Sequence, residues 1–506
     1  MKHTSRRAFL GGIGASAVSA SLAFAYASQL GWASDLTRRE RERLRFGAND
    51  ELIDLLQATP ADEVLPLVVQ RLKTGTTLVE LVGASALANA RAYGGTNYNG
   101  YHTLMALCPS FEMAVQAPGP YSALPVLKVV HRNARFLQES GCAHEDALAP
   151  VEPAAGDVHL AESIRAREVS KSERELAALA SRSLTDAYDQ LVTVVRDDID
   201  VHRIVLAWRA YDLLRMTGKD QTLTMFRQSL RFCIASDGNR EKRGQAASEV
   251  RALLPRLMEE HRLNERERGT KALDDARIEA LSVTLFSGER AAAAKAVAEA
   301  LGEGFAPEEV GRALSLAAVR LLLHDPGRAK EEPGKPVGSV HGASVGVHAS
   351  DAANAWRHIA RIAPAPAAAA NLIVGAYHTA GQSRNVGAEP FDRAHAPCEI
   401  AEPEKLLAEI SGRIRERDQA AAMAAARRYT ALRHSPEDLF ELLLEFAISE
   451  DGALHAEKFF RTAQEEHGFA RKSHRAEYLI ALTRVMASHH GFPAPGVAEA
   501  RKLLSA

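Results

Sequence analysis

Residues 289–327 read ERAAAAKAVAEALGEGFAPEEVGRALSLAAVRLLLHDPG, with an alanine-rich half followed by a leucine-rich half. Alanine and leucine lose little side-chain entropy in a helix, so both halves favour helices. Between them, Pro307 precedes Glu308 and Glu309, a pattern typical of a helix start because proline fits the first turn and acids complement the helix dipole. The run ends on Asp-Pro-Gly, which is typical of a helix end. We therefore predict two helices joined by a short break.

A second unit of the same kind occupies residues 416–452. Its alanine-rich half is followed by Ser-Pro-Glu-Asp at residues 435–438, then by an apolar half that ends on Asp-Gly. Elsewhere, apolar residues recur every three or four positions, as at Ile204, Trp208 and Tyr211, whereas strict alternation is scarce. These patterns predict an all-α protein, built of tandem helical-hairpin repeats or as a multi-helix bundle.

Two earlier segments carry a further helix-start signal. Residues 77–80 and residues 172–175 are capping boxes, in which a hydroxyl and a carboxyl group three residues apart satisfy free N–H groups of the first turn. They suggest that helical units also fill the first half of the chain. The predicted parts are a signal segment (1–33), an N-terminal helical domain (34–270) and a C-terminal helical repeat domain (271–506).

The composition of the 506-residue chain argues against several classes of protein. The formal net charge is −2, so no overall positive field would attract nucleic acid or an anionic membrane. The sequence has no P-loop and no GxGxxG after a strand, so we expect no nucleotide cofactor. None of the four cysteines forms a CxxC or CxxCH motif, so we expect neither a zinc ribbon nor haem c.

The N-terminus carries the pattern of a bacterial export signal. Arg6 and Arg7 follow Ser5 and precede Phe9 and Leu10, an order that resembles the S-R-R-x-F-L core of twin-arginine signals. A mildly apolar stretch with small-x-small cleavage options comes next. We therefore expect the Tat translocase to bind Arg6 and Arg7 and to export a folded protein to the periplasm. An uncleaved signal would leave an N-terminal membrane anchor, but the mature chain has no apolar run long enough to span a membrane.

A histidine stands close to the helix start that follows the break in each unit. In chain order these are His102, His202, His341 and His455. One structural position repeated in this way would place several imidazoles around a common axis. Neutral imidazole is the commonest side-chain ligand of transition metals, so the pattern indicates a metal site.

The third unit, which reads VHGASVGVHASDAANAWRHIAR from Val340, is the richest in such residues. In a helix, His348 and Asp351 would lie side by side, where an imidazole and a carboxylate can share a metal or form an acid–base pair. Small residues such as Gly346 would let another backbone approach closely. We predict Asp351 as the catalytic residue, a ligand or proton carrier. The predicted ligands for iron, zinc or copper are His102, His202, His341, His348 and His455.

These residues also have structural interpretations. A histidine near a helix start can simply bind a neighbouring loop, and an amphipathic helix can bury one imidazole and expose the others. The sequence has no HExxH or ExxH motif, so neither zincin nor di-iron carboxylate chemistry is indicated. His395 and Cys398 form a weaker candidate pair in a loop, and the position of Lys458 is more typical of a solvated side chain than of a nucleophile.

Residues 99–107, which read NGYHTLMAL, and residues 340–353 resemble segments of questin-oxidase-like proteins. That helical family is linked to oxygen-dependent ring cleavage. The resemblance implies an oxidoreductase and assigns no catalytic role to any particular residue.

Two functions are open at this point. The first is an exported, metal-dependent oxidoreductase, which requires the histidines to converge in one buried cavity. The second is a non-catalytic helical-repeat scaffold that binds a protein partner in the bacterial envelope, with histidines lying apart and a broad groove on one face.

Overall fold

The computed structural model describes residues 43–333, 335–340 and 344–506, and within these ranges the chain is helical, without a β-strand. The all-α prediction is therefore confirmed. Extended pairing in this part of the chain is limited to isolated bridges such as Lys271 with Phe305. The predicted signal segment, with Arg6 and Arg7, lies outside the described residues.

The helices follow one another with short connections. Those of the first half are α2 (Asp50–Ala58), α3 (Ala61–Lys73), α4 (Leu78–Tyr93), α5 (Tyr98–Gln116), α6 (Leu124–Glu139), α7 (Leu160–Arg165), α8 (Val169–Ala180), α9 (Leu184–Val195), α10 (Val201–Asp212), α11 (Leu214–Thr217), α12 (Thr222–Lys242) and α13 (Val250–Glu260). Those of the second half are α14 (Asp275–Phe286), α15 (Arg290–Gly302), α16 (Pro307–His324), α17 (Val345–Ile362), α18 (Ala365–Ala380), α19 (Pro403–Glu416), α20 (Gln419–Ala431), α21 (Pro436–Ser449), α22 (His455–Phe469), α23 (Arg475–His489) and α24 (Val497–Ser505). Short 3-10 turns are η1 (Gly47–Asn49), η2 (Gly119–Tyr121), η3 (Lys219–Gln221) and η4 (Ser383–Asn385).

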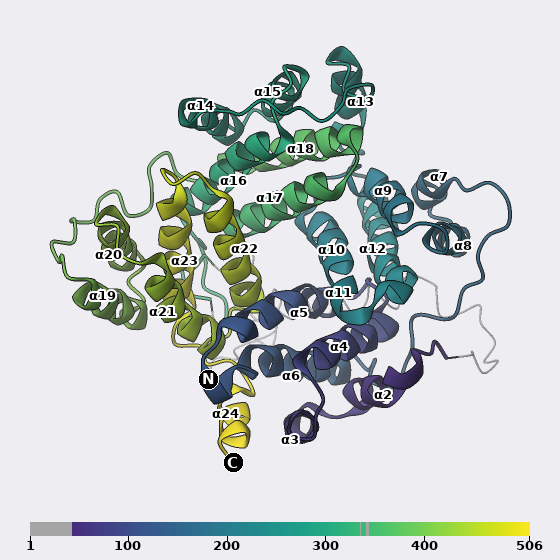
Figure 1. Ribbon diagram of the computed structural model, residues 1–506, viewed down its shortest axis with the longest axis horizontal. Coiled ribbons are helices and arrows are strands. Elements are labelled where there is room, and N and C mark those ends of the chain that lie inside the picture. The colour runs from purple at the N-terminus through teal and green to yellow at the C-terminus, as the bar shows by residue number, and fades with distance from the viewer. Residues whose placement is uncertain (1–42, 334, 341–343) are drawn as a thin grey trace, which may run out of the picture.

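Four helices meet near the centre of the molecule (Figure 1). Helix α5 packs against α10 and α22, and α17 packs against the same two helices, so the four form a closed ring of contacts. Helices α4 and α6 support α5, while α16 and α18 enclose α17. Helices from both predicted domains, 34–270 and 271–506, therefore surround one centre.

Several helices begin where the sequence predicts. Thr77 and Glu80 form a complete capping box at the start of α4. Pro307 and Pro436 are the first residues of α16 and α21, in the position where proline costs no helical hydrogen bond.

The second predicted capping box was wrong. Ser172 lies inside α8, which begins at Val169, and its hydroxyl contacts Ser163 of α7. Glu175 accepts a hydrogen bond of 2.6 Å from the same Ser163 hydroxyl. Both side chains therefore join α7 to α8, and this tertiary contact replaces the local one.

A close approach between α16 and α17 depends on Gly346. A Cβ atom placed on this glycine would lie 2.2 Å from the Cα atom of Leu322, nearer than any side chain can approach. The prediction that small residues would let another backbone come close is confirmed at this position. The contact fixes the first turn of α17, which also carries His348.

A buried ion pair holds α22 against α6. Nζ of Lys128 lies 2.7 Å from the carboxylate of Glu457, and both side chains are almost fully buried. Lys128 also donates to the carbonyl oxygens of Ala447 and Glu450, which satisfies the buried ammonium group. The first turn of α22 is therefore held in place by charge as well as by packing.

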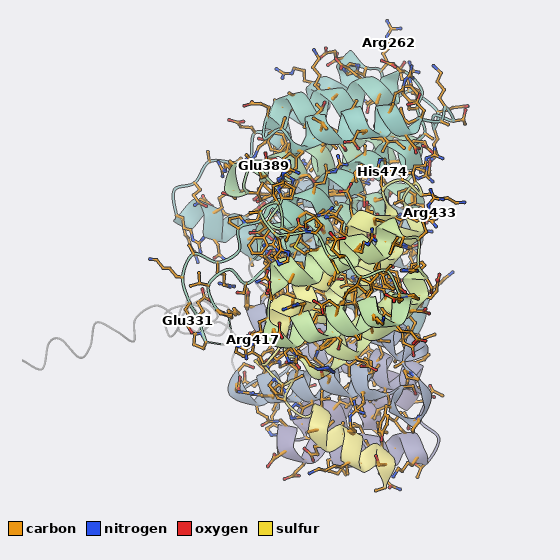
Figure 2. All side chains as sticks on the ribbon, turned by 90° about the vertical axis from the view of Figure 1, so that its left-hand side faces the viewer. Arg262, Glu331, Glu389, Arg417, Arg433 and His474 are labelled. Atoms are coloured by element: carbon orange, nitrogen blue, oxygen red, sulfur yellow. The ribbon has the colours of Figure 1, made fainter. Side chains whose placement is uncertain are left out.

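Charged side chains cover the outside of this helical body. Figure 2 shows Arg262, Glu331 and Arg433 at its periphery, and all three are exposed. Among the described helices, none is long and apolar enough to cross a bilayer.

Candidate metal centre

Four histidines from four different helices meet where those helices cross. The ring centroid of His102 lies 4.8 Å from that of His202 and 5.6 Å from that of His455. The ring centroid of His348 lies 5.7 Å from that of His202 and 5.1 Å from that of His455. These contacts close a ring, which we call the four-histidine cluster. His341, the fifth predicted ligand, lies outside the described residues.

His102 is oriented by its own helix. Asn97 caps α5 by accepting a hydrogen bond from the N–H group of Gly100. Nδ1 of His102 lies 2.8 Å from the carbonyl oxygen of Tyr98, so Nδ1 carries the proton, because a carbonyl can only accept. In the neutral ring, Nε2 of His102 therefore carries the lone pair.

His202 is oriented by a carboxylate. Asp200 caps α10 by accepting from the N–H groups of His202 and Arg203, and the same carboxylate oxygen lies 3.3 Å from Nδ1 of His202. Burial opposes ionisation of Asp200, but its hydrogen bonds to His202 and Arg203 hold its pKa well below the usual range. An imidazole held by a carboxylate in this way is typical of metal-binding histidines.

His455 is the first residue of α22, after a turn in which Ala453 and Leu454 have positive φ angles. Its Nδ1 donates to the carbonyl oxygen of Ala453 over 2.9 Å, so its Nε2 is also an acceptor. Nε2 of His455 lies 3.1 Å from Nε2 of His348. In the absence of a metal, His348 must donate the proton of this contact.

The Nε2 atoms of the other two histidines in the cluster, His102 and His202, are buried and have no hydrogen-bond partner among the described residues. A buried lone pair without a donor is costly, and a metal ion would satisfy it. Burial lowers the pKa values of His102, His348 and His455 well below the ordinary range, and the nearby charge of Lys458 adds to the effect. These three rings are therefore neutral near pH 7, as metal ligands must be.

Two further ionisable groups lie beside the cluster. Asp351 is buried on α17, and its carboxylate accepts a 2.8 Å hydrogen bond from the Thr462 hydroxyl of α22. Burial raises the pKa of Asp351, while the charge of Lys458 opposes the rise. Burial lowers the pKa of Lys458 to about 8, with Asp351 and Glu457 opposing the fall. Lys458 is only 3% exposed, so the prediction of a solvated lysine was wrong, because α22 turns this face inward.

A surface cleft lies beside residues that contact two histidines of the cluster. It has a volume of about 610 Å³, and Tyr98, Tyr101 and Asp200 line it together with Phe232. The ring of Tyr98 lies 4.2 Å from that of His102, and the ring of Tyr101 lies 5.3 Å from that of His202. Tyr98 is 52% exposed, so it reaches from the cluster to solvent.

One histidine near the cluster escaped the sequence analysis. His378 lies on the apolar helix α18, where it accepts a 3.5 Å hydrogen bond from Nε1 of Trp356. Burial lowers its pKa to about 4, and its charge would disfavour protonation of His348. A single histidine in an otherwise apolar helix could have indicated this position. The sequence analysis looked for histidines near helix starts, and His378 lies near the end of α18.

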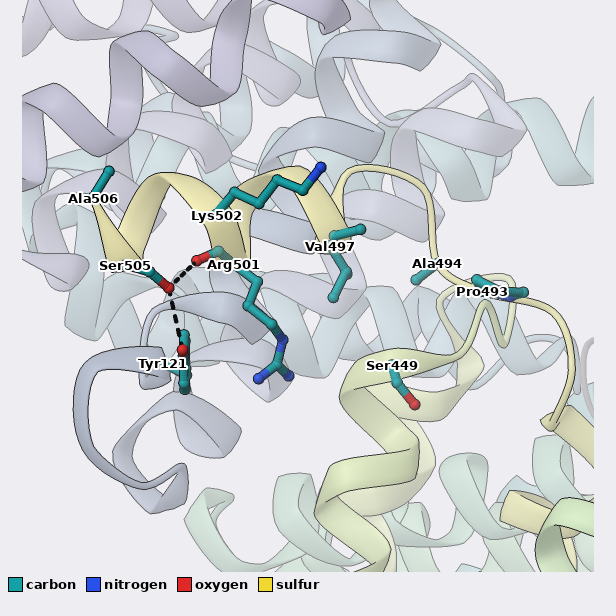
Figure 3. A pocket seen from close by; sticks show the side chains of 10 residues that line it. Tyr121, Ser449, Pro493, Ala494, Val497, Arg501, Lys502, Ser505 and Ala506 are labelled. Carbon is teal, nitrogen blue, oxygen red and sulfur yellow. Dashed lines mark hydrogen bonds between the residues drawn. The ribbon is translucent and has the colours of Figure 1, made fainter.

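Two other clefts lie elsewhere. His395 and Cys398 line one of about 490 Å³, where Nδ1 of His395 donates to its neighbour Ala396. The other, of about 770 Å³, lies beside α24, and Figure 3 shows Tyr121 joined there to Ser505 by a 3.2 Å hydrogen bond. None of these three clefts is lined by a member of the four-histidine cluster.

Among residues 43–333, 335–340 and 344–506, no group of three or more His, Cys, Asp or Glu side chains is arranged so that it could hold a metal ion. No family model, curated protein or solved structure matches the chain.

Proposed function

We propose that the four-histidine cluster binds a transition-metal ion and that the protein is a metal-dependent oxidoreductase. The proposal is carried by one observation: His102 and His202, whose rings are in contact, both have buried Nε2 atoms that make no hydrogen bond with the described residues. His348 and His455 complete this ring. Neutral nitrogen ligands of this kind suit iron, copper or zinc.

The spacing of the rings supports a shared metal ion. An ion about 2.0–2.1 Å from each Nε2 would lie about 3.2 Å from each ring centroid, so ligands at angles of about 90–110° would have centroids about 4.5–5.3 Å apart. The observed separations range from 4.8 Å to 5.7 Å. Metal binding would require the two longer sides to contract by less than about 0.5 Å and all four Nε2 atoms to turn towards one point, and it would replace the contact between His348 and His455.

Residues beside the four-histidine cluster could supply proton transfer and a substrate site. Asp351 and Lys458 are buried groups of opposite charge that can hold or move a proton beside it. The cleft lined by Tyr98, Tyr101 and Asp200, which contact His102 or His202, would serve as the substrate site. The redox assignment itself draws on the resemblance of residues 99–107 to questin-oxidase-like proteins and on the export signal, whose cargo often carries a cofactor. The alternative function, a non-catalytic scaffold, requires histidines that lie apart, so the ring contacts among the four histidines favour the metal-dependent enzyme.

Metal analysis of the full-length protein tests the proposal. The protein is produced in a host with twin-arginine export, purified without chelator and measured by elemental mass spectrometry. We expect near-stoichiometric iron, copper or zinc, lost in His348→Ala and in His455→Ala. His395→Ala, in an exposed loop, is the matched control and keeps the metal.

The outcomes separate the two parts of the proposal. Metal-free wild-type protein that stays metal-free after reconstitution with each ion would exclude the metal centre. Bound iron or copper whose electron paramagnetic resonance spectrum changes on reduction supports redox chemistry. A site that holds zinc alone would overturn the oxidoreductase assignment while keeping the metal centre.

A further inference from the structure

Polar contacts between α17 and α22 extend from the four-histidine cluster to the surface of the molecule. The first is the contact between two histidines of the cluster, and the next is the hydrogen bond from Thr462 to Asp351. Further along both helices, Nε2 of His358 lies 3.0 Å from a carboxylate oxygen of Glu465. The side chain of Glu465 is 24% exposed, so this line of contacts ends at solvent.

His358 is a neutral imidazole with one ring nitrogen unpaired. Burial lowers its pKa. Burial opposes ionisation of Glu465, but the hydrogen bond from His358 and the charge of Arg461 hold its pKa well below the usual range. Glu465 is therefore a carboxylate that can only accept, so Nε2 of His358 carries the proton. Nη2 of Arg357 also approaches Nε2, but it donates to Glu466 over 2.7 Å. Nδ1 of His358 then holds a lone pair, and it is buried without a donor among the described residues.

Two other buried polar atoms beside His358 also lack partners among the described residues. The indole ring of Trp208 on α10 is stacked on the imidazole ring of His358, with centroids 4.7 Å apart, and its Nε1 donor has no acceptor. Asn354 lies one turn before His358 on α17. Its Nδ2 donates to Glu465 and Glu466, which leaves Oδ1 without a donor. Trp208 is 5% exposed and Asn354 is 1% exposed, so bulk solvent does not satisfy these atoms.

One water molecule matches this set of one donor and two acceptors. It would accept a hydrogen bond from Nε1 of Trp208 and donate to Nδ1 of His358 and to Oδ1 of Asn354. Buried waters make about three hydrogen bonds of this kind to groups that the protein leaves unsatisfied. Burying the same three atoms without partners would be costly.

Such a water would connect His358 with the carboxyl group of Asp351. Asp351 precedes Asn354 by three positions on α17, a spacing that brings two side chains together on one face of a helix. A proton that leaves Asp351 can pass to the water, which protonates Nδ1 of His358. Nε2 then releases its own proton to Glu465, which passes it to solvent. One proton enters the ring as one leaves it, so His358 changes its tautomer and keeps its charge.

We propose that a water molecule bound by Trp208, Asn354 and His358 forms, together with Glu465, a proton relay between Asp351 and solvent. The relay rests on the proposed function, because it serves a reaction at the metal beside Asp351. The water itself does not depend on a metal. The inference adds His358 as a proton-transferring residue outside the four-histidine cluster.

Nuclear magnetic resonance of the full-length protein, labelled with ¹⁵N at tryptophan, tests the water. Trp208→Phe and Trp356→Phe assign the two indole N–H signals. We expect a cross-peak between the indole N–H proton of Trp208 and water. Trp356 is the matched control, because its indole is only 1% exposed and donates to His378, so it should show no such cross-peak. No water contact at Trp208, or equal contacts at both indoles, would overturn the water site.

Stopped-flow oxidation of the metal-loaded protein by ferricyanide, followed with a pH-indicator dye, tests the relay. Loss of one electron raises the charge beside Asp351 and Lys458 and lowers their pKa values, so oxidation releases protons. His358→Gln keeps a donor for Glu465 but cannot exchange protons. It should slow proton release by about 100-fold, the lower end of what a positioned acid–base group contributes, and keep the metal. His467→Gln, on α22 beside Phe440, is the control and should release protons at the wild-type rate.

The outcomes separate the relay from the proposed function. Proton release at the wild-type rate in His358→Gln, with metal retained, would overturn the relay and leave the metal centre intact. If His358→Gln fails to fold, Trp208→Phe carries the test, because it keeps a ring against His358, removes the donor to the water and should also slow proton release. Protein without a redox-active metal would exclude the relay along with the oxidoreductase, while a water contact at Trp208 would still establish the water site.

Discussion

The Nε2 atoms of His348 and His455 lie 3.1 Å apart although 107 positions separate the two residues in the chain. Neither helix could produce this contact alone. Gly346 sets α17 against α16, and the pair of Lys128 with Glu457 sets α22 against α6. The cluster is therefore a product of tertiary packing, and changes to these supports should alter it.

Asp200→Asn should weaken metal binding without unfolding the protein. Asparagine caps a helix about as well as aspartate does, so α10 should keep its start. The variant lacks the negative charge that holds Nδ1 of His202, and losses of such partners lower metal affinity by about 10–100-fold. Competition with a chromophoric chelator measures the affinity.

Asp220→Asn provides the control for this experiment. Asp220 is exposed in the short turn η3, so its replacement should leave the metal affinity unchanged. Equal affinities of wild type and Asp200→Asn would mean that Asp200 serves the helix start and not the cluster.

His378 should make the metal-free protein less stable in acid. Its folded-state pKa of about 4 lies below the ordinary 6.5, so between these pH values the unfolded chain binds a proton that the folded chain does not. Stability therefore falls as the pH drops through this window, by about 3 kcal/mol in total for this residue. Urea unfolding at pH 7 and at pH 4.5 measures the loss.

His378→Gln isolates this contribution. Glutamine does not titrate and still offers an acceptor to Nε1 of Trp356, so this variant should lose less stability in acid than wild type. His395→Gln, at an exposed position, should follow wild type. An acid loss in His378→Gln as large as in wild type would contradict the assignment.

Local sequence chemistry predicted the helices and the histidines of the cluster. Proline with following acids marks the starts of α16 and α21, and each break places a histidine close to the next helix start. Such signals are local, because capping and helix dipoles act within one turn. The same logic failed for Ser172, whose hydroxyl contacts α7 instead.

Contacts between helices could not be predicted in this way. Spacing placed Asp351 on the same face as His348, but it could not show that Thr462 of another helix would bind its carboxylate. Burial of Lys458 and the position of His378 depend equally on which helices pack together. The spacing of residues in a sequence shows which side chains share a face of a helix. It does not show which other helix packs against that face.

Gly346→Ala should destabilise the protein and disturb the cluster. The new methyl group would lie within 2.2 Å of the Cα atom of Leu322, so α16 and α17 must separate. Overpacking of this kind costs about 1–3 kcal/mol. Gly412→Ala in α19 is the control, since nothing lies within 4 Å of its added methyl group. It should be neutral or stabilising by about 0.5–1 kcal/mol. Thermal unfolding compares the two, and an equal melting temperature for both variants would contradict the close approach.

Lys128→Met should be among the most destabilising single changes. It leaves the carboxylate of Glu457 buried without its cation, and breaking one side of a buried pair costs about 3–5 kcal/mol. Because Glu457 lies in the first turn of α22, metal occupancy at His455 should fall as well. The double variant Lys128→Met with Glu457→Met removes both charges, and it should recover much of the stability by denaturant unfolding. If the double variant were no more stable than Lys128→Met, the lost stability would come from the packing of the lysine and its bonds to Ala447 and Glu450, and not from the stranded charge.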